Sequence, residues 1–262
     1  MQASLFPDAT PSPVAAFSPV SRIMTGCAGW SLPRALWLSF PAEGTHLQRY
    51  AARLNAVEIN SSFYRPHRFE TYARWTASVP EHFRFSVKLP KTITHPQRLV
   101  DCGELLDDFL AQAGGLGQKL GCLLVQLPPS LAFEQDTVAA FLRLLRARHP
   151  GPVALEPRHA SWFTAPADPL LAAWQVGGVL ADPVVHEAGR LLGGFSDLVY
   201  ARLHGSPPMY YSAYDGAVLD ALVARLRLAA TPDTAVWCIF ENTAEGAAIE
   251  DALYTVQGLA RR

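Results

Sequence analysis

The sequence predicts a single (β/α)8 barrel of the TIM type, with eight parallel strands in its core and helices around them. Eight short apolar segments have strand character, most are followed by a segment with helical periodicity, and the chain has 262 residues. Strand-then-helix alternation requires parallel pairing with helices outside, and about 250 residues is a usual size for this barrel. An open doubly wound sheet is the alternative, but GCAGWS, which ends the first strand, lacks the G-x-G-x-x-G pattern typical of that fold.

The elements follow from the apolar runs and their periodicity. The predicted strands are at 23–30, 56–60, 84–90, 121–129, 152–158, 177–182, 198–205 and 235–242. The predicted helices are at 45–54, 68–78, 103–113, 134–148, 168–175, 218–228 and 244–259. Thr45 is a suitable N-cap for the first helix, and the apolar residues of segment 134–148 have the spacing of an amphipathic face.

The domain organisation is simple, because no internal repeat and no second domain is found. We expect a barrel domain at 23–262 and a flexible N-terminal extension at 1–22, a segment with four prolines and many small residues. This segment lacks the basic start and apolar stretch of a signal peptide. No apolar run reaches the roughly 18–20 residues that cross a bilayer.

Composition indicates a cytoplasmic protein with a large core. Apolar residues make up 50% of the chain and charged residues 17%, and the formal net charge is −1. Nucleic acid and anionic membranes are therefore not expected as partners, although a local basic patch is not excluded. The cysteines form no CxxC pair, and we expect reduced, structural thiols at Cys27, Cys102, Cys122 and Cys238.

Polar residues end nearly every predicted strand, and the sites of these barrels lie at the carboxyl ends of the strands. In the segment VEINSSFYRP, 57–66, alternation puts Val57 and Ile59 on one face and directs Glu58 and Asn60 inward. The same alternation directs Glu156 and Arg158 inward from the fifth strand and Arg202 and His204 inward from the seventh. For the eighth strand either Glu241 or Asn242 could point inward. The expected ring of charged side chains consists of Glu58, Glu156, Asp182, Glu241, Lys88, Arg158, Arg202 and His204.

Such a ring is either a self-satisfied ion network that plugs the barrel or a ligand site, since buried charges are costly unless they are paired or bound. The adjoining loops favour a ligand site. Segment 89–98 carries basic and hydroxyl side chains suited to an anion such as phosphate. Segments 156–163 and 204–214 carry aromatic side chains suited to a sugar or base face.

Six segments, in this order, resemble a known family, the domain-of-unknown-function family 72 or YecE-like family: VEINSSFYR, FRFSVKLPKTITH, LGCLLVQLPPS, EPRHASWF, YARLHG and FENT. The resemblance covers nearly all of 23–257 and implies a (β/α)8 barrel, but it brings no settled activity. The family usually has Phe-Asn-Asn-Thr where this chain has FENT at 240–243. It often has Glu-Phe-Arg-His where this chain has EPRH at 156–159. Asn242 is therefore a more secure site residue than Glu241.

We therefore expect an enzyme, a hydrolase or an isomerase, that acts on a small anionic substrate such as a phosphorylated sugar or a nucleotide-like molecule. The expected acid and base groups are Glu58, Glu156 and His204. The expected substrate-binding residues are Trp30, Asn60, Tyr64, Lys88, His95, Gln126, Arg158, His159, Trp162, Asp182, Arg202 and Asn242. A non-catalytic barrel that binds a ligand is a further alternative.

A metal-dependent phosphodiesterase or isomerase is also an alternative. Its ligands would come from Glu58, Glu156, Asp182 and His204, with His95, His159 or Glu241 in addition. No HxH or HExxH spacing is present, and the three cations of the ring balance three of its acids, so no metal site or cofactor is predicted and a divalent ion stays an alternative.

Two expectations concern single side chains of the ring. Lys88 could form a Schiff base, but a salt bridge to Glu58 is favoured. The substitutions Glu58→Gln and Arg202→Ala are expected to leave the fold largely intact and to abolish ligand binding.

Overall fold

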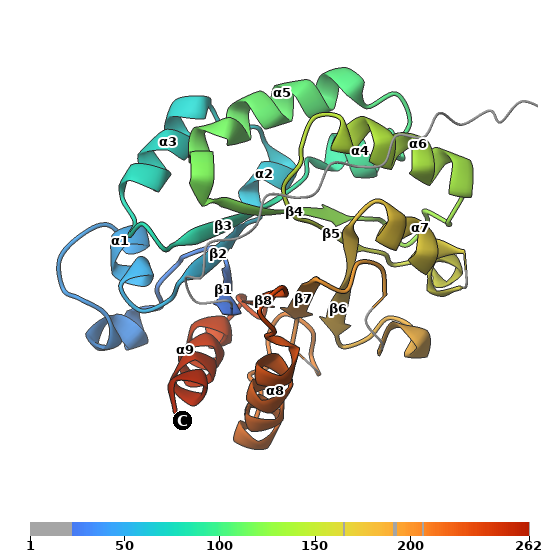
Figure 1. Ribbon diagram of the computed structural model, residues 1–262. Helices are drawn as coiled ribbons and strands as arrows, with labels where there is room; N and C mark the ends of the chain where they lie inside the picture. The colour runs from blue at the N-terminus through green and yellow to red at the C-terminus, as the bar shows by residue number, and fades with distance from the viewer. Residues whose placement is uncertain (1–22, 165, 191–192, 206, 262) are drawn as a thin grey trace, which may run out of the picture.

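The structure, a computed structural model, describes residues 23–164, 166–190, 193–205 and 207–261. Eight parallel strands form a closed barrel in sequence order, in which β1 pairs with both β2 and β8 (Figure 1). They are β1 (Ile23–Ala28), β2 (Ala56–Ile59), β3 (Arg84–Lys88), β4 (Leu120–Gln126), β5 (Val153–Glu156), β6 (Val176–Asp182), β7 (Leu198–Leu203) and β8 (Ala235–Phe240). The predicted (β/α)8 barrel is confirmed, and the closed sheet excludes the open alternative. The predicted extension at 1–22 lies outside the described residues.

Helices surround the barrel (Figure 1). The α-helices are α1 (His46–Ala51), α2 (Ser61–Tyr64), α3 (Phe69–Ala77), α4 (Lys91–Thr94), α5 (Gly103–Ala113), α6 (Gln135–Arg146), α7 (Ala167–Ala173), α8 (Gly216–Ala229) and α9 (Ala247–Ala260). The 3-10 segments are η1 (Arg34–Ser39), η2 (Gly114–Lys119), η3 (Ala160–Phe163) and η4 (Glu187–Arg190). Among the described helices, none is both long enough and apolar enough to span a membrane.

Local sequence explains where the predicted helices begin. The Thr45 hydroxyl accepts a hydrogen bond from the Gln48 backbone N–H, and the Gln48 side chain accepts one from the Thr45 N–H, which forms a capping box at the start of α1. Glu134 caps α6, because its carboxylate accepts from the N–H groups of Asp136 and Thr137. The seven predicted helices all occur, with ends that differ from the prediction by a few residues.

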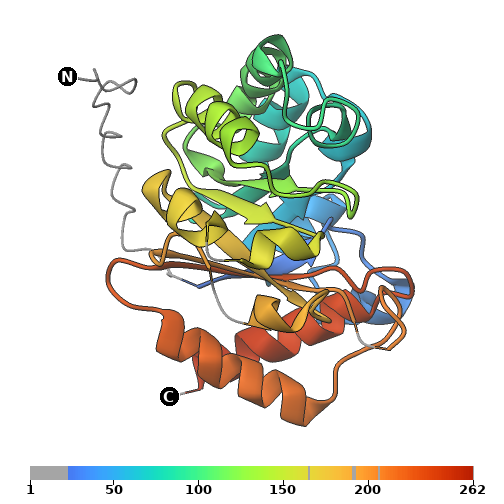
Figure 2. The ribbon, with the colours of Figure 1, turned by 90° about the vertical axis from the view of Figure 1, so that its right-hand side faces the viewer.

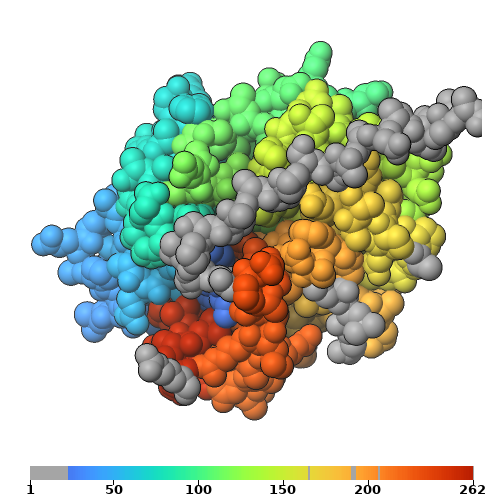
Figure 3. Space-filling view, in the orientation of Figure 1, coloured from blue at the N-terminus to red at the C-terminus, as the bar shows by residue number. Residues whose placement is uncertain are grey.

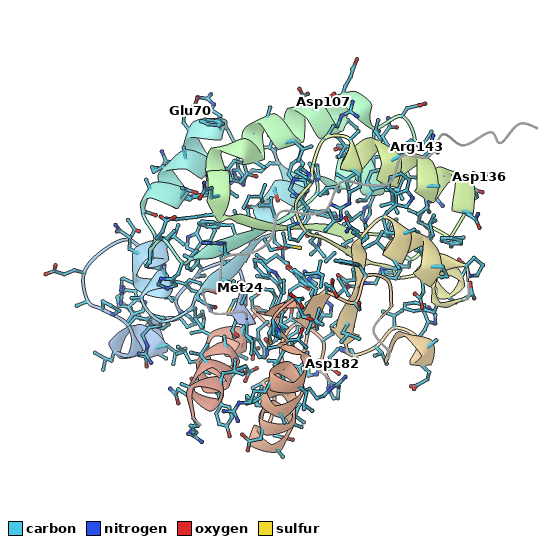
Figure 4. All side chains as sticks on the ribbon, in the orientation of Figure 1. Met24, Glu70, Asp107, Asp136, Arg143 and Asp182 are labelled. Atoms are coloured by element: carbon cyan, nitrogen blue, oxygen red, sulfur yellow. The ribbon has the colours of Figure 1, made fainter. Side chains whose placement is uncertain are left out.

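Apolar side chains lie on both faces of the sheet. The larger core fills the space between strands and helices, and a separate apolar cluster, which includes Met24, Leu124, Tyr200 and Trp237, lies inside the barrel. Figure 4 labels Met24 within the ring of strands. Only glycine fits at position 121 beside the Trp237 ring, because a Cβ atom at Gly121 would lie 2.7 Å from that ring. Large apolar side chains therefore occupy the part of the interior where the strands begin.

The two ends of the barrel differ. Seen from the side, α8 and α9 run back along the barrel, and α9 ends at the side where the strands begin (Figure 2). Figure 3 looks onto that end. The charged residues predicted from the sequence come at the opposite end, after the carboxyl termini of the strands. This is the end at which sites occur in this fold.

The cysteine thiols provide a test of the packing. Cys27, Cys102, Cys122 and Cys238 are all free and buried, and burial raises the pKa of each thiol. We expect a thiol reagent such as dithionitrobenzoate to leave the native protein unmodified and to titrate all four thiols in guanidinium chloride. Rapid reaction of one thiol in the native protein would contradict a purely structural role for it.

Candidate functional site

The site is organised around Arg202, an inward-facing residue of β7 with no exposed surface. Its Nε and Nη2 atoms donate to the two oxygens of Glu58 at 3.0 and 2.7 Å, and its Nη1 donates to Glu156 at 2.5 Å. Nη2 also lies 2.8 Å from Glu241. Burial by itself would lower the pKa of Arg202, but the three carboxylates raise it well above its usual range. The guanidinium therefore stays charged.

A hydroxyl layer lies beneath the guanidinium. The Tyr200 hydroxyl donates to Glu58 at 2.8 Å and lies 2.7 Å from the Ser86 hydroxyl. The Tyr200 ring stacks on Trp237, with centroids 5.8 Å apart, so the polar layer rests directly on the apolar interior. Tyr200 and Ser86 were not among the predicted site residues. The alternation that turned Arg202 inward applies equally to Tyr200, two residues earlier in β7, and Ser86 precedes Lys88 by two residues in β3, so the same pattern could have found both.

His204 follows β7 and is paired with carboxylates at both nitrogens. Its Nδ1 lies 2.5 Å from Glu241, and its Nε2 lies 3.4 Å from Glu156. Burial would lower the pKa of His204, but these two carboxylates raise it above 6.5. In return, although burial opposes it, Arg202 and His204 lower the pKa of Glu156 well below its usual range and that of Glu241 to about 2. All these groups therefore favour their ionised forms.

Arg158 and Asn60 lie at the outer side of this cluster and keep unused hydrogen-bonding groups. Arg158 Nη2 lies 2.5 Å from Glu156, while its buried Nε has no partner among the described residues. Asn60 donates to Glu241 at 3.0 Å, while its buried Oδ1 likewise lacks a donor. Buried polar atoms without partners are uncommon. A bound molecule with both acceptor and donor groups would satisfy this pair.

Lys88 differs from the expectation. The favoured salt bridge to Glu58 is not formed, because Arg202 and Tyr200 occupy the Glu58 carboxylate. The Lys88 ammonium lies instead 4.2 Å from the centroid of the Phe63 ring. Burial and the nearby Arg202 charge lower the pKa of Lys88, and the carboxylates of the cluster only partly oppose this shift.

The structure does not bring Asp182 and Asn242 into the cluster. The Asp182 carboxylate accepts a hydrogen bond from Tyr214 at 2.7 Å, and the Asn242 amide donates to Asp251 of α9 at 2.7 Å. The eighth strand therefore contributes Glu241 to the cluster, the residue that the sequence analysis considered less secure. Both predicted residues hold the loops around the site instead of facing its interior.

Two predicted residues after β5 serve the packing of the loops. Trp162 is buried and donates its indole N–H to the Leu131 carbonyl at 2.8 Å. His159 caps η3, because its Nδ1 accepts from the Ser161 backbone N–H and lies 2.8 Å from the Ser161 hydroxyl. The Trp162 ring, which we expected to contact a sugar or base, is therefore packed inside the protein instead.

The remaining predicted residues lie around the mouth. Gln126 donates to the Leu127 carbonyl, His95 packs edge-on against Phe63 with centroids 5.1 Å apart, and Tyr64 is 75% exposed. Trp30 packs edge-on against Trp75 at 4.9 Å. None of these contacts joins the ion-paired cluster directly.

A pocket of about 780 Å³ lies at β1, β2 and the loop before α9, and none of the charged residues of the cluster lines it. Trp30 and Asn60 both line it, together with Ser61 and Glu245. Because the Asn60 amide also donates to Glu241, this residue connects the pocket with the charged cluster. The pocket is large enough for a small metabolite.

The metal alternative finds little geometric support. Within the ranges that the structure describes, no three His, Cys, Asp or Glu side chains converge in an arrangement that could hold a metal ion. Glu58 and Glu156 are occupied by Arg202, and Asp182 is held by Tyr214. The proposed metal ligands are therefore already engaged with other side chains.

Comparison with known proteins gives a consistent result. The family described as "Protein of unknown function DUF72" matches residues 24–262. UPF0759 protein YecE of Escherichia coli K12 is 34% identical over 106 residues, 40% of this chain and 38% of that protein. UPF0759 protein YunF of Bacillus subtilis is 30% identical over 151 residues, 55% of this chain and 53% of that protein. The matched region thus spans less than two thirds of either relative.

Solved structures share the fold. A DUF72 family protein from Enterococcus faecalis has a TM-score of 0.74 at 23% identity, over 92% of this chain and 96% of that one. A DUF72 family protein from Thermotoga maritima also has a TM-score of 0.74 at 23% identity, over 90% and 98%. At this level of identity the likeness concerns the fold alone.

The pairing around Arg202 predicts a large effect of its removal. Arg202→Met leaves the buried Glu58 and Glu156 without their counter-charge, and we expect it to lower the free energy of unfolding by roughly 3–5 kcal/mol. The expectation of an intact fold in Arg202→Ala is revised for the same reason. The triple variant Arg202→Met, Glu58→Gln, Glu156→Gln should recover most of the loss. Urea unfolding of the three proteins tests this, and equal stability of wild type and Arg202→Met would refute it.

The pKa shifts predict how stability depends on pH. Since the pKa of His204 is raised on folding, its contribution to the free energy of unfolding is fully present below pH about 6.5 and is lost as the pH rises through the folded-state pKa. The pKa of Glu241 is lowered, so its contribution to the free energy of unfolding is present above pH 4.5 and is lost as the pH falls toward about 2. The difference in unfolding free energy between wild type and His204→Gln should therefore shrink from pH 6 to pH 9. The exposed His82→Gln is the control, and a constant difference for His204→Gln would contradict the assignment.

Proposed function

Since this chain belongs to the DUF72 family, whose description names no activity, we propose from the site itself that the protein is an enzyme acting on a small anionic substrate at the carboxyl ends of the strands. The observation that supports this most is the uneven use of polar groups in the cluster. Glu58 and Arg202 are fully engaged with each other, whereas Arg158 and Asn60 retain buried atoms without partners. A plug that only stabilised the barrel would not need these unused groups.

Arg158 is the residue that we assign to the anion. Its side chain is 14% exposed, and its Nε is available for a carboxylate or phosphate oxygen. Asn60 Oδ1 would accept a hydrogen bond from a substrate hydroxyl. When Lys88 and His204 are both protonated, the three carboxylates face four cations and the cluster carries one positive charge. This balance favours an anionic ligand.

His204 and Glu241 are the pair that we assign to proton transfer. Glu241 lies close to Nδ1, whereas Nε2 has only the longer contacts of 3.4 Å with Glu156 and with Arg158 Nη2, so Nε2 is the nitrogen that we assign to proton exchange with the substrate. The raised pKa of His204 lets it act as an acid near neutral pH. Tyr210 packs edge-on against His204, with centroids 5.7 Å apart, and would have to move to admit a substrate.

Glu58 and Glu156 receive a different role from the one expected. Both accept from Arg202, and the lowered pKa of Glu156 makes it a weak base. We assign them to the positioning of Arg202 and His204. Acid and base chemistry of this kind serves hydrolases and isomerases, and the substrate class is a small phosphorylated or carboxylated compound.

Titration with matched ligands tests the anion site. We expect calorimetry to detect saturable binding of ribose 5-phosphate but not of ribose, and Arg158→Gln to weaken it at least about tenfold through loss of a charge-assisted hydrogen bond. Arg143→Gln is the control, because Arg143 is an exposed residue on α6, outside the barrel (Figure 4). Equal binding by wild type and Arg158→Gln would reject the assignment of Arg158. Equal affinity for ribose and ribose 5-phosphate would reject an anion site.

A further inference from the structure

Lys88 is an unusual basic residue in this chain. Nineteen of the twenty-two basic residues are arginine, and the three lysines are Lys88, Lys91 and Lys119. Lys119 donates to the carbonyls of Thr76 and Val79, and Lys91 is exposed on α4. Lys88 alone among the three belongs to the charged cluster.

The Lys88 amine is held in place without being neutralised by a neighbour. The residue ends β3, is 6% exposed, and its backbone carbonyl accepts from the buried Ser62 hydroxyl at 2.7 Å. In the part of the chain that the structure describes, its Nζ forms neither an ion pair nor a hydrogen bond, and it faces the Phe63 ring. The carboxylates that could pair with it, Glu58 and Glu241, contact Arg202 instead.

This position suits a primary amine better than a guanidinium. An arginine is always protonated and could only bind a ligand, whereas a lysine amine can lose its proton and attack a carbonyl carbon. Burial and the charge of Arg202 lower the pKa of Lys88, which increases the fraction of free amine. The adjacent ring of Phe63 limits the access of water to the amine.

We propose that Lys88 forms an imine with an aldehyde or ketone that carries an anionic group, which deepens the proposed function and rests on it, because Arg158 holds that group. The Nζ lone pair of the free amine forms a bond to the carbonyl carbon, nitrogen loses one proton and the former carbonyl oxygen gains one, which gives a carbinolamine. The hydroxyl group is then protonated and leaves as water while the nitrogen lone pair forms the C=N bond, and loss of the second proton from nitrogen gives the neutral imine. His204, whose pKa is raised by Glu156 and Glu241, is the acid available for this step.

Reductive trapping tests the proposal. The full-length protein is incubated with glycolaldehyde phosphate or with glycolaldehyde, each with sodium cyanoborohydride, and is examined by intact mass and by peptide mapping. Reduction of the imine gives a stable secondary amine whose added mass is that of the carbonyl compound less one oxygen atom. We expect Lys88 to be modified at least about tenfold faster than Lys91 of the same molecule, because burial and the nearby Arg202 charge increase the fraction of free amine at Lys88.

The controls separate this proposal from that of the anion site. Lys88→Arg should abolish the rapid modification, and Lys91→Arg should leave it unchanged. Equal modification of Lys88 by both aldehydes supports the imine and rejects the anion site. A modification rate at Lys88 no higher than at Lys91 overturns the imine proposal, even if ribose 5-phosphate binds as expected. The Lys88 and Lys91 comparison uses the wild-type protein and so does not depend on the folding of a variant.

Discussion

The structure of the site depends on one fully buried guanidinium. Arg202 contacts carboxylates from β2, β5 and the end of β8, and so connects strands on different sides of the barrel. Removing these charges from water is costly, and the cost is offset only because the guanidinium donates to Glu58 through two nitrogens and to Glu156 through a third. A lysine could not form this planar, multiple contact. The geometry of the cluster therefore follows from the choice of arginine at this position.

The same guanidinium divides the barrel interior into two parts. Beneath it, the hydroxyl of Tyr200 joins Glu58 to Ser86, and the Tyr200 ring rests on Trp237. On its other side lie Arg158 and Asn60, which have buried hydrogen-bonding atoms without partners. The ion network and the candidate binding site, which the sequence presents as alternatives, are thus successive layers of one interior, and the inner layer fixes the positions of the outer one.

Sequence alternation predicted most of this arrangement, and its failures have a physical reason. Glu58, Glu156 and Arg202 lie inside regular strands, where successive side chains alternate reliably. Asp182 ends β6, and Asn242 lies two residues beyond β8, where alternation no longer determines direction and loop contacts with Tyr214 and Asp251 decide it. The partner of Lys88 could not be predicted from the sequence either, because only the structure shows that Arg202, and not Lys88, pairs with the Glu58 carboxylate.

The network also determines which groups can change their charge near neutral pH. Arg202, Glu156 and Glu241 are held in their ionised forms, since the guanidinium lowers the pKa of both carboxyls and they raise its own. His204 and Lys88 are shifted in opposite directions, the pKa of the imidazole upward and that of the amine downward, so that both move toward the neutral range. Two titratable groups whose surroundings shift them in this way are the usual basis of acid and base roles in one site. A fixed ionic layer beneath two adjustable groups is the physical arrangement on which the proposed catalytic role rests.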